Sequence, residues 1–279
     1  MRRSVAAALL GLLLGGCASD FLPASVLNDL RVLAILADPL EVGPGQQVAL
    51  RPAVYLPPGA TISSQRWTFC PLSAGSVAGY GCAVPQCEVE LPAAGDGSTT
   101  ADPSALAQQC IASAGVALPP VLPEVIDVTF TYQVASSQGQ SRQAVLQLPL
   151  WTQGPPPDPN RPPVIERVEI GGVPVFPTPG APAPLPAGAA VAVHVVVDPA
   201  SVQTYLDAAG TAVTETMTTS WYTTAGRLSA DRATGVDTAV DLEAIDLEEG
   251  QTAADVYVVV RDLRGGQALA GPFTVPILR

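Results

Sequence analysis

The stretch DVTFTYQV at 127–134, followed by the polar turn SSQG at 136–139 and the segment VLQLPL at 145–150, decides the fold. Apolar and polar side chains alternate along both segments, and a period of two around a glycine-containing turn predicts a β-hairpin. The pattern recurs 128 residues later, as DVYVVVRD at 255–262, a turn with Gly265 and Gly266, and FTVPIL at 273–278. Two successive units of the chain therefore each end in the same kind of hairpin.

The two units also match upstream of their hairpins. The segment GQQVAL at 45–50 parallels GAAVAV at 188–193, and Trp67 parallels Trp221. Each unit thus contains a glycine, a strand, a strand with a tryptophan and a closing hairpin. Both tryptophans fall where a β-sandwich buries such a residue between its sheets, so Trp67 and Trp221 are expected core residues.

A proline-rich segment separates the two units. The sequence QGPPPDPNRPP at 153–163 has six prolines in eleven residues, a composition that favours the extended, semi-rigid polyproline II conformation. We therefore expect a first domain at 31–152, a linker at 153–163 that holds the domains apart, and a second domain at 164–279. The layout resembles tandem immunoglobulin-like domains of bacterial surface proteins, including the polycystic-kidney-disease and cadherin-like types. That resemblance implies an all-β fold of two immunoglobulin-like β-sandwiches.

The first seventeen residues have the features of an export signal. Arg2 and Arg3 precede a ten-residue apolar run at 5–14, which is too short to span a bilayer. The run ends in LGGC at 14–17, which resembles the lipobox of bacterial lipoproteins. The resemblance implies that 1–17 is a signal peptide, that Cys17 becomes the acylated first residue of the mature protein, and that 18–30 is a tether. Ala18 rather than Asp follows Cys17, which implies the outer membrane and leaves the leaflet open.

The arrangement as a whole resembles predicted envelope lipoproteins of GC-rich Gram-negative bacteria, a resemblance that implies no particular activity. The formal net charge is −12, and without a basic stripe the chain is not expected to bind nucleic acid.

Four further cysteines, Cys70, Cys82, Cys87 and Cys110, lie in a segment at about 70–115 that the second unit lacks. An even number of cysteines in an exported chain favours two disulfides over a zinc site, whose paired ligand spacing is missing. A hairpin placing Cys70 opposite Cys87 favours the pairs Cys70–Cys87 and Cys82–Cys110, with sequential pairing nearly as well supported. Within this insert, Asp102, Pro103 and Gly115 predict the start and end of one short helix.

Candidate chemistry is sparse. His194 is the only histidine and alternation places it on the solvent face of a strand; no GxSxG elbow and no phosphate loop accompany it, so we expect no enzymatic activity. We expect no metal or cofactor beyond the lipid. Calcium at the acidic stretch 237–255 is the weaker alternative to a solvated edge, and Arg161 replaces the Asp of the calcium-binding linker that 158–163 resembles. Trp151 and Tyr80 are the aromatic candidates for ligand contact.

These expectations combine into a non-enzymatic, lipid-anchored envelope protein that serves as a surface spacer or as a protein-binding or adhesion module. The alternative is a periplasm-facing structural subunit of an outer-membrane assembly. The expected partners are the membrane, through the lipid, and an envelope or extracellular protein that the sequence does not identify. The sequence also leaves the oligomeric state of the protein open. Because long loops on a rigid sandwich often carry recognition, we hypothesise that the insert makes the specific contact.

Overall fold

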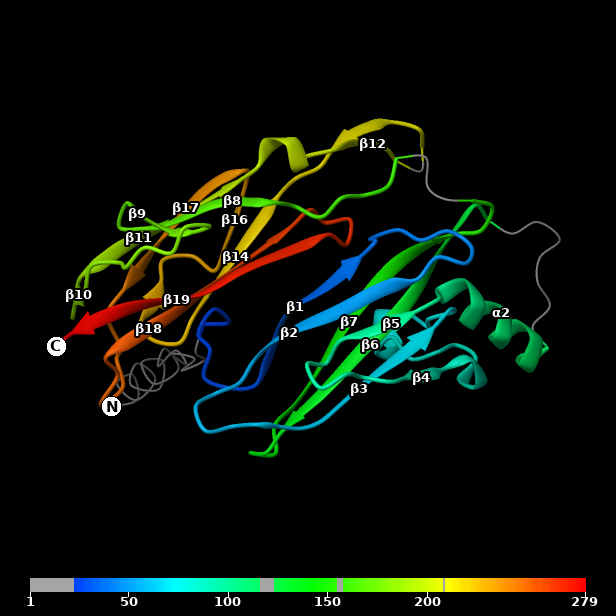
Figure 1. Cartoon of the computed structure of the whole chain (residues 1–279), viewed down its shortest axis with the longest axis horizontal. Coiled ribbons are helices and arrows are strands. Elements are labelled where there is room, and N and C mark those ends of the chain that lie inside the picture. The colour runs from blue at the N-terminus through cyan, green and yellow to red at the C-terminus, as the bar shows by residue number, and fades with distance from the viewer. Residues whose placement is uncertain (1–22, 116–122, 155–157, 208) are drawn as a thin grey trace, which may run out of the picture.

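The computed structural model describes residues 23–115, 123–154, 158–207 and 209–279, which fold into two β-sandwiches (Figure 1). Cys17 and the rest of the expected signal peptide lie outside the described residues. We refer to residues 31–152 as domain 1 and to residues 164–279 as domain 2. The expected all-β fold, with a disulfide-braced insert and a short helix in the first sandwich, is confirmed.

Domain 1 consists of two facing antiparallel sheets. One has the order β1-β2-β5 and the other the order β4-β3-β6-β7. The strands are β1 (Arg31–Asp38), β2 (Val48–Tyr55), β3 (Ile62–Cys70), β4 (Val89–Leu91), β5 (Thr99–Ala101), β6 (Val125–Ser136) and β7 (Ser141–Trp151). The insert between β3 and β6 contains the 3-10 turns η1 (Ser76–Ala78) and η2 (Pro85–Cys87) and the helix α2 (Pro103–Ala114).

The core of domain 1 forms around Trp67, which is fully buried. Its ring lies 4.8 Å from that of Tyr132, and its indole Nε1 donates a hydrogen bond to the Gly97 carbonyl at 2.7 Å. Gly97 has φ 83°, and a Cβ there would lie 2.9 Å from Pro52, so a glycine is required for the carbonyl to reach the indole. Burial also raises the pKa of Tyr132 to about 12.

Domain 2 repeats the two-sheet arrangement with five strands in each sheet, in the orders β15-β17-β11-β8-β9 and β10-β19-β18-β14-β16. The strands of the first sheet are β8 (Ile165–Ile170), β9 (Val173–Phe176), β11 (Ala190–Val197), β15 (Arg227–Leu228) and β17 (Asp237–Glu243). Those of the second are β10 (Leu185–Pro186), β14 (Thr218–Thr223), β16 (Arg232–Thr234), β18 (Ala253–Arg261) and β19 (Gln267–Leu278). The turn η3 (Pro199–Ser201) and the two-stranded ribbon β12 (Thr204–Leu206) with β13 (Ala212–Thr214) complete it.

The closing hairpins expected from the repeat are present in both domains. Strand β6 pairs with β7 along its length, and β18 pairs with β19, with Asp255 opposite Thr274. Trp221 on β14 is fully buried and lies opposite Val258 of β18. The two tryptophans therefore occupy equivalent places, each on the strand that neighbours the first strand of the closing hairpin.

The two domains pack against each other, so the expectation that the linker holds them apart is wrong. Leu33 and Tyr55 of domain 1 and Val259 of domain 2 form a separate buried apolar cluster. The Tyr55 and Tyr257 rings meet edge to face at 6.0 Å. The physical reason is that β18 buries Val258, Val259 and Val260 in succession, which means that both of its faces are covered at this point.

A packed segment at the start of the described chain joins the domains a second time. Leu27 N donates to the Thr223 carbonyl at 2.7 Å, and Thr223 N donates to the Ser25 carbonyl at 2.8 Å. Ser25, Leu27 and Leu30 are all buried. From Pro23 onward, the segment expected as a tether is thus part of the fold and lies along β14 of domain 2 before it enters domain 1.

Candidate functional site

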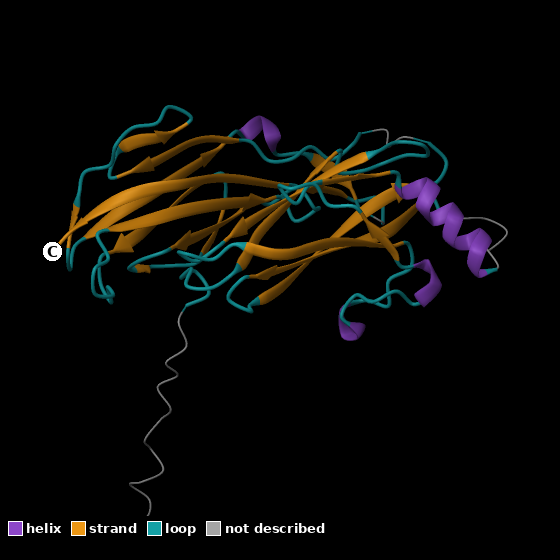
Figure 2. Cartoon of the chain, turned by 60° about the horizontal axis from the view of Figure 1, so that its bottom comes forward, coloured by secondary structure: helices purple, strands orange, loops and turns teal. Residues whose placement is uncertain are grey.

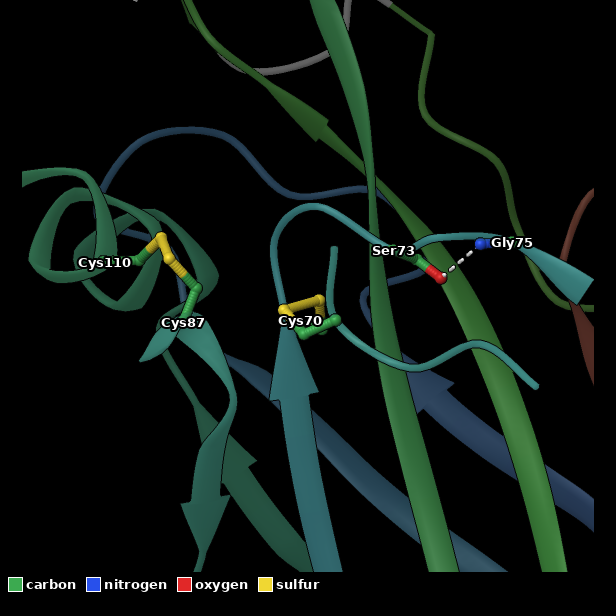
Figure 3. Close-up of a disulfide and its surroundings, with 6 residues drawn as sticks. Cys70, Ser73, Gly75, Cys87 and Cys110 are labelled. Carbon is green, nitrogen blue, oxygen red and sulfur yellow. Dashed lines mark hydrogen bonds between the residues drawn. A yellow bond between two sulfur atoms is a disulfide. The ribbon is translucent and has the colours of Figure 1, made fainter. Parts of the chain in front are cut away.

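The insert of domain 1 gathers at the end of the molecule opposite the C-terminus (Figure 2). Two disulfides brace it, Cys70–Cys82 and Cys87–Cys110 (Figure 3). The expected pairs Cys70–Cys87 and Cys82–Cys110 are wrong, and the sequential alternative is the one observed. All four cysteines are therefore paired.

The local backbone explains this connectivity. After β3 the chain turns back on itself, with Ala83 N donating to the Leu72 carbonyl and Ala74 N to the Gly81 carbonyl, both at 2.8 Å. This small hairpin places Cys82 next to Cys70. Strand β4 does pair with β3, as the rejected pairing assumed. Cys87, however, lies in η2, which packs against α2, and its sulfur meets Cys110 there.

Helix α2 begins and ends as the sequence predicts. Asp102 caps it by accepting a hydrogen bond from Ala105 N at 3.0 Å, and Gly115 ends it with φ 61°. Ser104 Oγ donates to Asp102 and accepts from Gly45 N at 2.9 Å, which ties the helix start to the loop before β2. Together with the Cys87–Cys110 disulfide, these contacts fix both the start and the middle of the helix.

Helix α2, the segment after Cys70 and the ends of β6 and β7 enclose a mostly apolar pocket of about 310 Å³. Its apolar walls come from both halves of the insert and from both strands. The lining residues that give it this character are Leu72, Ile111, Ile126, Leu150, Trp151 and Pro71. Sequence reasoning assigned recognition to the insert but did not identify this pocket.

The two aromatic residues singled out from the sequence differ in their environments. Trp151 is half-buried, lines the pocket, and donates from Nε1 to Glu41 Oε2 at 3.2 Å. Tyr80 is half-buried in the first disulfide loop with φ 60°. The most exposed apolar side chain of that loop is instead Val77 in η1, which is fully exposed.

His194 lies on the outer face of β11, whose neighbours Val193 and Val195 are buried, as alternation predicts. Its Nε2 is 2.5 Å from Asp237 Oδ1 and its Nδ1 is 3.4 Å from Glu169 Oε2. The hydrogen bond to Asp237 raises the pKa of His194 above 6.5, with partial burial acting in the opposite direction. Both ring nitrogens thus face carboxylates on neighbouring strands, an arrangement that stabilises a charged imidazole.

The acidic stretch and the linker form no cation site in the described part of the chain. No three histidine, cysteine or acidic side chains there are arranged to hold a metal ion. In the linker, Asn160 is buried and its Nδ2 donates to Asp262 Oδ2 at 3.0 Å. Arg161 N donates to Gln203 Oε1 at 2.7 Å. The linker residues that resemble a calcium-binding junction are thus bound to domain 2.

A polar cluster at the domain junction was not foreseen from the sequence. Arg264 donates from Nη2 to Glu41 Oε1 at 3.0 Å and from Nη1 to Glu215 Oε1 at 2.7 Å, and its guanidinium lies 4.2 Å from the centre of the Tyr205 ring. Burial raises the pKa of the nearby Asp262, while hydrogen bonds from Arg264 N, Asn160 and Gly266 N lower it. We call these residues the junction cluster: Glu41, Asn160, Tyr205, Glu215, Asp262 and Arg264.

The chain matches no protein family and no curated protein. Among solved structures it is similar to the D00-D0 domain of intimin, with 12% identity and a TM-score of 0.25 over 90% of this chain and 99% of that one. It is also similar to fibronectin(III)-like modules of Clostridium thermocellum CbhA, with 7% identity and a TM-score of 0.26 over 89% and 93%. A DUF3823 family protein from Bacteroides ovatus has 10% identity and a TM-score of 0.26 over 87% and 98%.

These similarities concern the fold alone and identify no family. None of the helices in the described part of the chain has the length and apolar character needed to cross a bilayer.

Proposed function

We propose that this protein is a non-enzymatic envelope lipoprotein, anchored in the outer membrane through Cys17, whose insert in domain 1 binds another protein. The observation that carries the binding role is the pocket beneath α2, because each disulfide braces one of the two insert segments that line it. A braced surface loses little conformational entropy on binding. The lipobox resemblance at 14–17 supports the anchor.

The absence of an enzymatic role is part of the proposal. The two ring nitrogens of His194 face carboxylates, and no serine or cysteine among the described residues is hydrogen-bonded to them. The described cysteines are disulfide-bonded. Nucleophilic catalysis requires a nucleophile next to a base, and the His194 site lacks one among the described residues. The packed domains then serve as a rigid support for the insert.

The anchor is tested by metabolic labelling with a palmitate analogue, comparing the native chain with Cys17→Ser. We expect label on the native chain only, and the variant in the soluble fraction after cell lysis. If the native chain and Cys17→Ser stay in the membrane fraction to the same extent and neither is labelled, the lipid anchor is contradicted. Protease treatment of intact and lysed cells then distinguishes the adhesion role from the periplasmic subunit, because only a surface-exposed chain is cleaved before lysis.

The binding role is tested by a photo-crosslinking amino acid placed at Val77 in the insert or at Leu206 in domain 2. Both positions are highly exposed, at 102% and 69%, so neither substitution disturbs a core. We expect a discrete covalent adduct from position 77 in living cells and none from position 206. Adducts from position 206 alone, or from neither position, would contradict a contact through the insert.

A further inference from the structure

The insert surface around the pocket differs from the rest of the chain in its charge. Neither 70–87 nor 103–123 contains a single Arg, Asp or Glu, although 14% of all residues are charged. The fold brings 70–87 and the helix α2 together, because the disulfide Cys87–Cys110 joins them and the pocket is lined from both. None of the residues that line the pocket is charged, so the lining gives no electrostatic preference to anionic or cationic partners.

The polar groups of the pocket are largely engaged within the protein. Trp151 Nε1 is bound to Glu41, Ser104 Oγ to Asp102 and Gly45, and Thr152 Oγ1 to the Pro123 carbonyl at 2.8 Å. A sugar presents many hydroxyls, each of which loses free energy if it is desolvated without a partner. The pocket therefore suits an apolar group and not a carbohydrate.

One polar side chain at the pocket is differently placed. Gln108 lies on α2, lines the pocket and is exposed, and no hydrogen bond engages its amide within the described residues. An amide both donates and accepts, which matches the N–H and C=O of a peptide backbone. The apolar walls can take apolar side chains of a peptide while the Gln108 amide pairs with its backbone.

From this arrangement we infer that the pocket beneath α2 binds an uncharged, apolar peptide segment of a partner protein, with apolar side chains in the pocket and backbone at Gln108. The inference rests on the proposed function and specifies the partner of the same site. The pocket volume of about 310 Å³ lies at the small end of ligand sites, about 300–1,000 Å³. It therefore suits one or two side chains of a peptide.

The test selects a random heptapeptide phage library against the mature lipoprotein in nanodiscs, with empty nanodiscs as counter-selection. We expect enrichment of peptides that lack charged residues and carry neighbouring apolar residues. Binding of synthetic copies is then measured by fluorescence anisotropy. Enrichment of charged peptides, or of none, would overturn the inference, as would binding of neutral oligosaccharides in place of peptides.

Point variants locate the binding. Leu72→Asp places a charge at the rim, where Leu72 is 40% exposed, and Ile111→Phe reduces the pocket from the α2 side. Each should weaken the selected peptides by about tenfold or more, the cost of about 1.4 kcal/mol. The matched control Leu206→Asp, on exposed Leu206 of domain 2, should leave affinity unchanged. Circular dichroism confirms that each variant is folded.

The outcomes separate this inference from the proposed function. If Leu72→Asp and Ile111→Phe leave peptide affinity unchanged while crosslinks from position 77 persist in cells, the insert binds a partner elsewhere and the pocket assignment is wrong. If Leu72→Asp weakens peptide binding and also abolishes the crosslinks from position 77, the pocket assignment and the proposed function are both supported. Weaker peptide binding without any crosslink in cells would support the pocket and contradict the proposed cellular contact.

Discussion

Arg264 of domain 2 and Glu41 of domain 1 form an ion pair at 3.0 Å across 223 residues of sequence, and both side chains are largely buried, at 17% and 8% exposure. The same guanidinium also pairs with Glu215, whose side chain is completely buried. One arginine thus pairs with a carboxylate from each domain. This side chain therefore adds a polar link between the domains to the apolar cluster around Val259.

Replacement of Arg264 should therefore destabilise the whole protein. Arg264→Ala leaves two buried carboxylates without their cation, and breaking a buried pair in this way costs about 3 kcal/mol. Urea unfolding should show this loss, and small-angle scattering should show a larger maximum dimension at low urea. Arg232→Ala is the matched control, since Arg232 is exposed on β16, and it should change stability by less than about 0.5 kcal/mol. Equal stability of the two variants would mean that the junction cluster does not join the domains.

The apolar half of the interface gives a second prediction. Val259 is completely buried between the domains, so Val259→Asp places a carboxylate in a cluster of apolar side chains. We expect the domains to separate while each core stays folded, because Val259 belongs to neither domain core. Limited proteolysis should then cleave the linker faster than in the native chain. The control Val164→Asp changes a valine that is 51% exposed, and its linker should be cleaved at the native rate.

The parts of the fold that follow from local sequence could be predicted. Alternation gave both closing hairpins, and Asp102 with Gly115 marked the helix α2, because a strand period and a cap depend only on neighbouring residues. Contacts between distant residues left no such signal. Nothing near Arg264 identifies Glu41 as its partner, and an outward-facing Val259 in a valine-rich strand is equally compatible with a solvent-exposed or a covered face.

In the candidate site too, local sequence predicts some features, while others depend on contacts between distant residues. Even numbers of cysteines predicted two disulfides, but connectivity depends on whether Cys87 continues into β4 or turns toward α2, and η2 decides this. The pocket depends on α2, the segment after Cys70 and the ends of β6 and β7 meeting in space. The one signal that could have located it is the absence of charge from both 70–87 and 103–123.

The disulfides should contribute unequally to stability. Cys70–Cys82 closes 12 residues of chain and Cys87–Cys110 closes 23, and the cost of ordering an open loop rises with its length. Each is worth about 3 kcal/mol, with the longer loop about 0.5 kcal/mol more. In urea unfolding, the double variant Cys87→Ser/Cys110→Ser should therefore lose more free energy of unfolding than Cys70→Ser/Cys82→Ser. Non-reducing peptide mapping of the native chain checks the pairing, and recovery of a Cys70–Cys87 peptide would contradict it.

His194 predicts how stability changes with pH. Because the pKa of His194 is raised in the folded state, the folded chain binds its proton more tightly than the unfolded chain. The resulting stabilisation is complete below about pH 6.5 and is lost as pH rises through the folded-state pKa. Asp237 is 68% exposed, so solvent screening limits the effect to about 0.5 kcal/mol. Since the chain has one histidine, His194→Gln should remove the change in unfolding free energy between pH 6 and 8.5. An unchanged pH dependence in that variant would show that another group carries it.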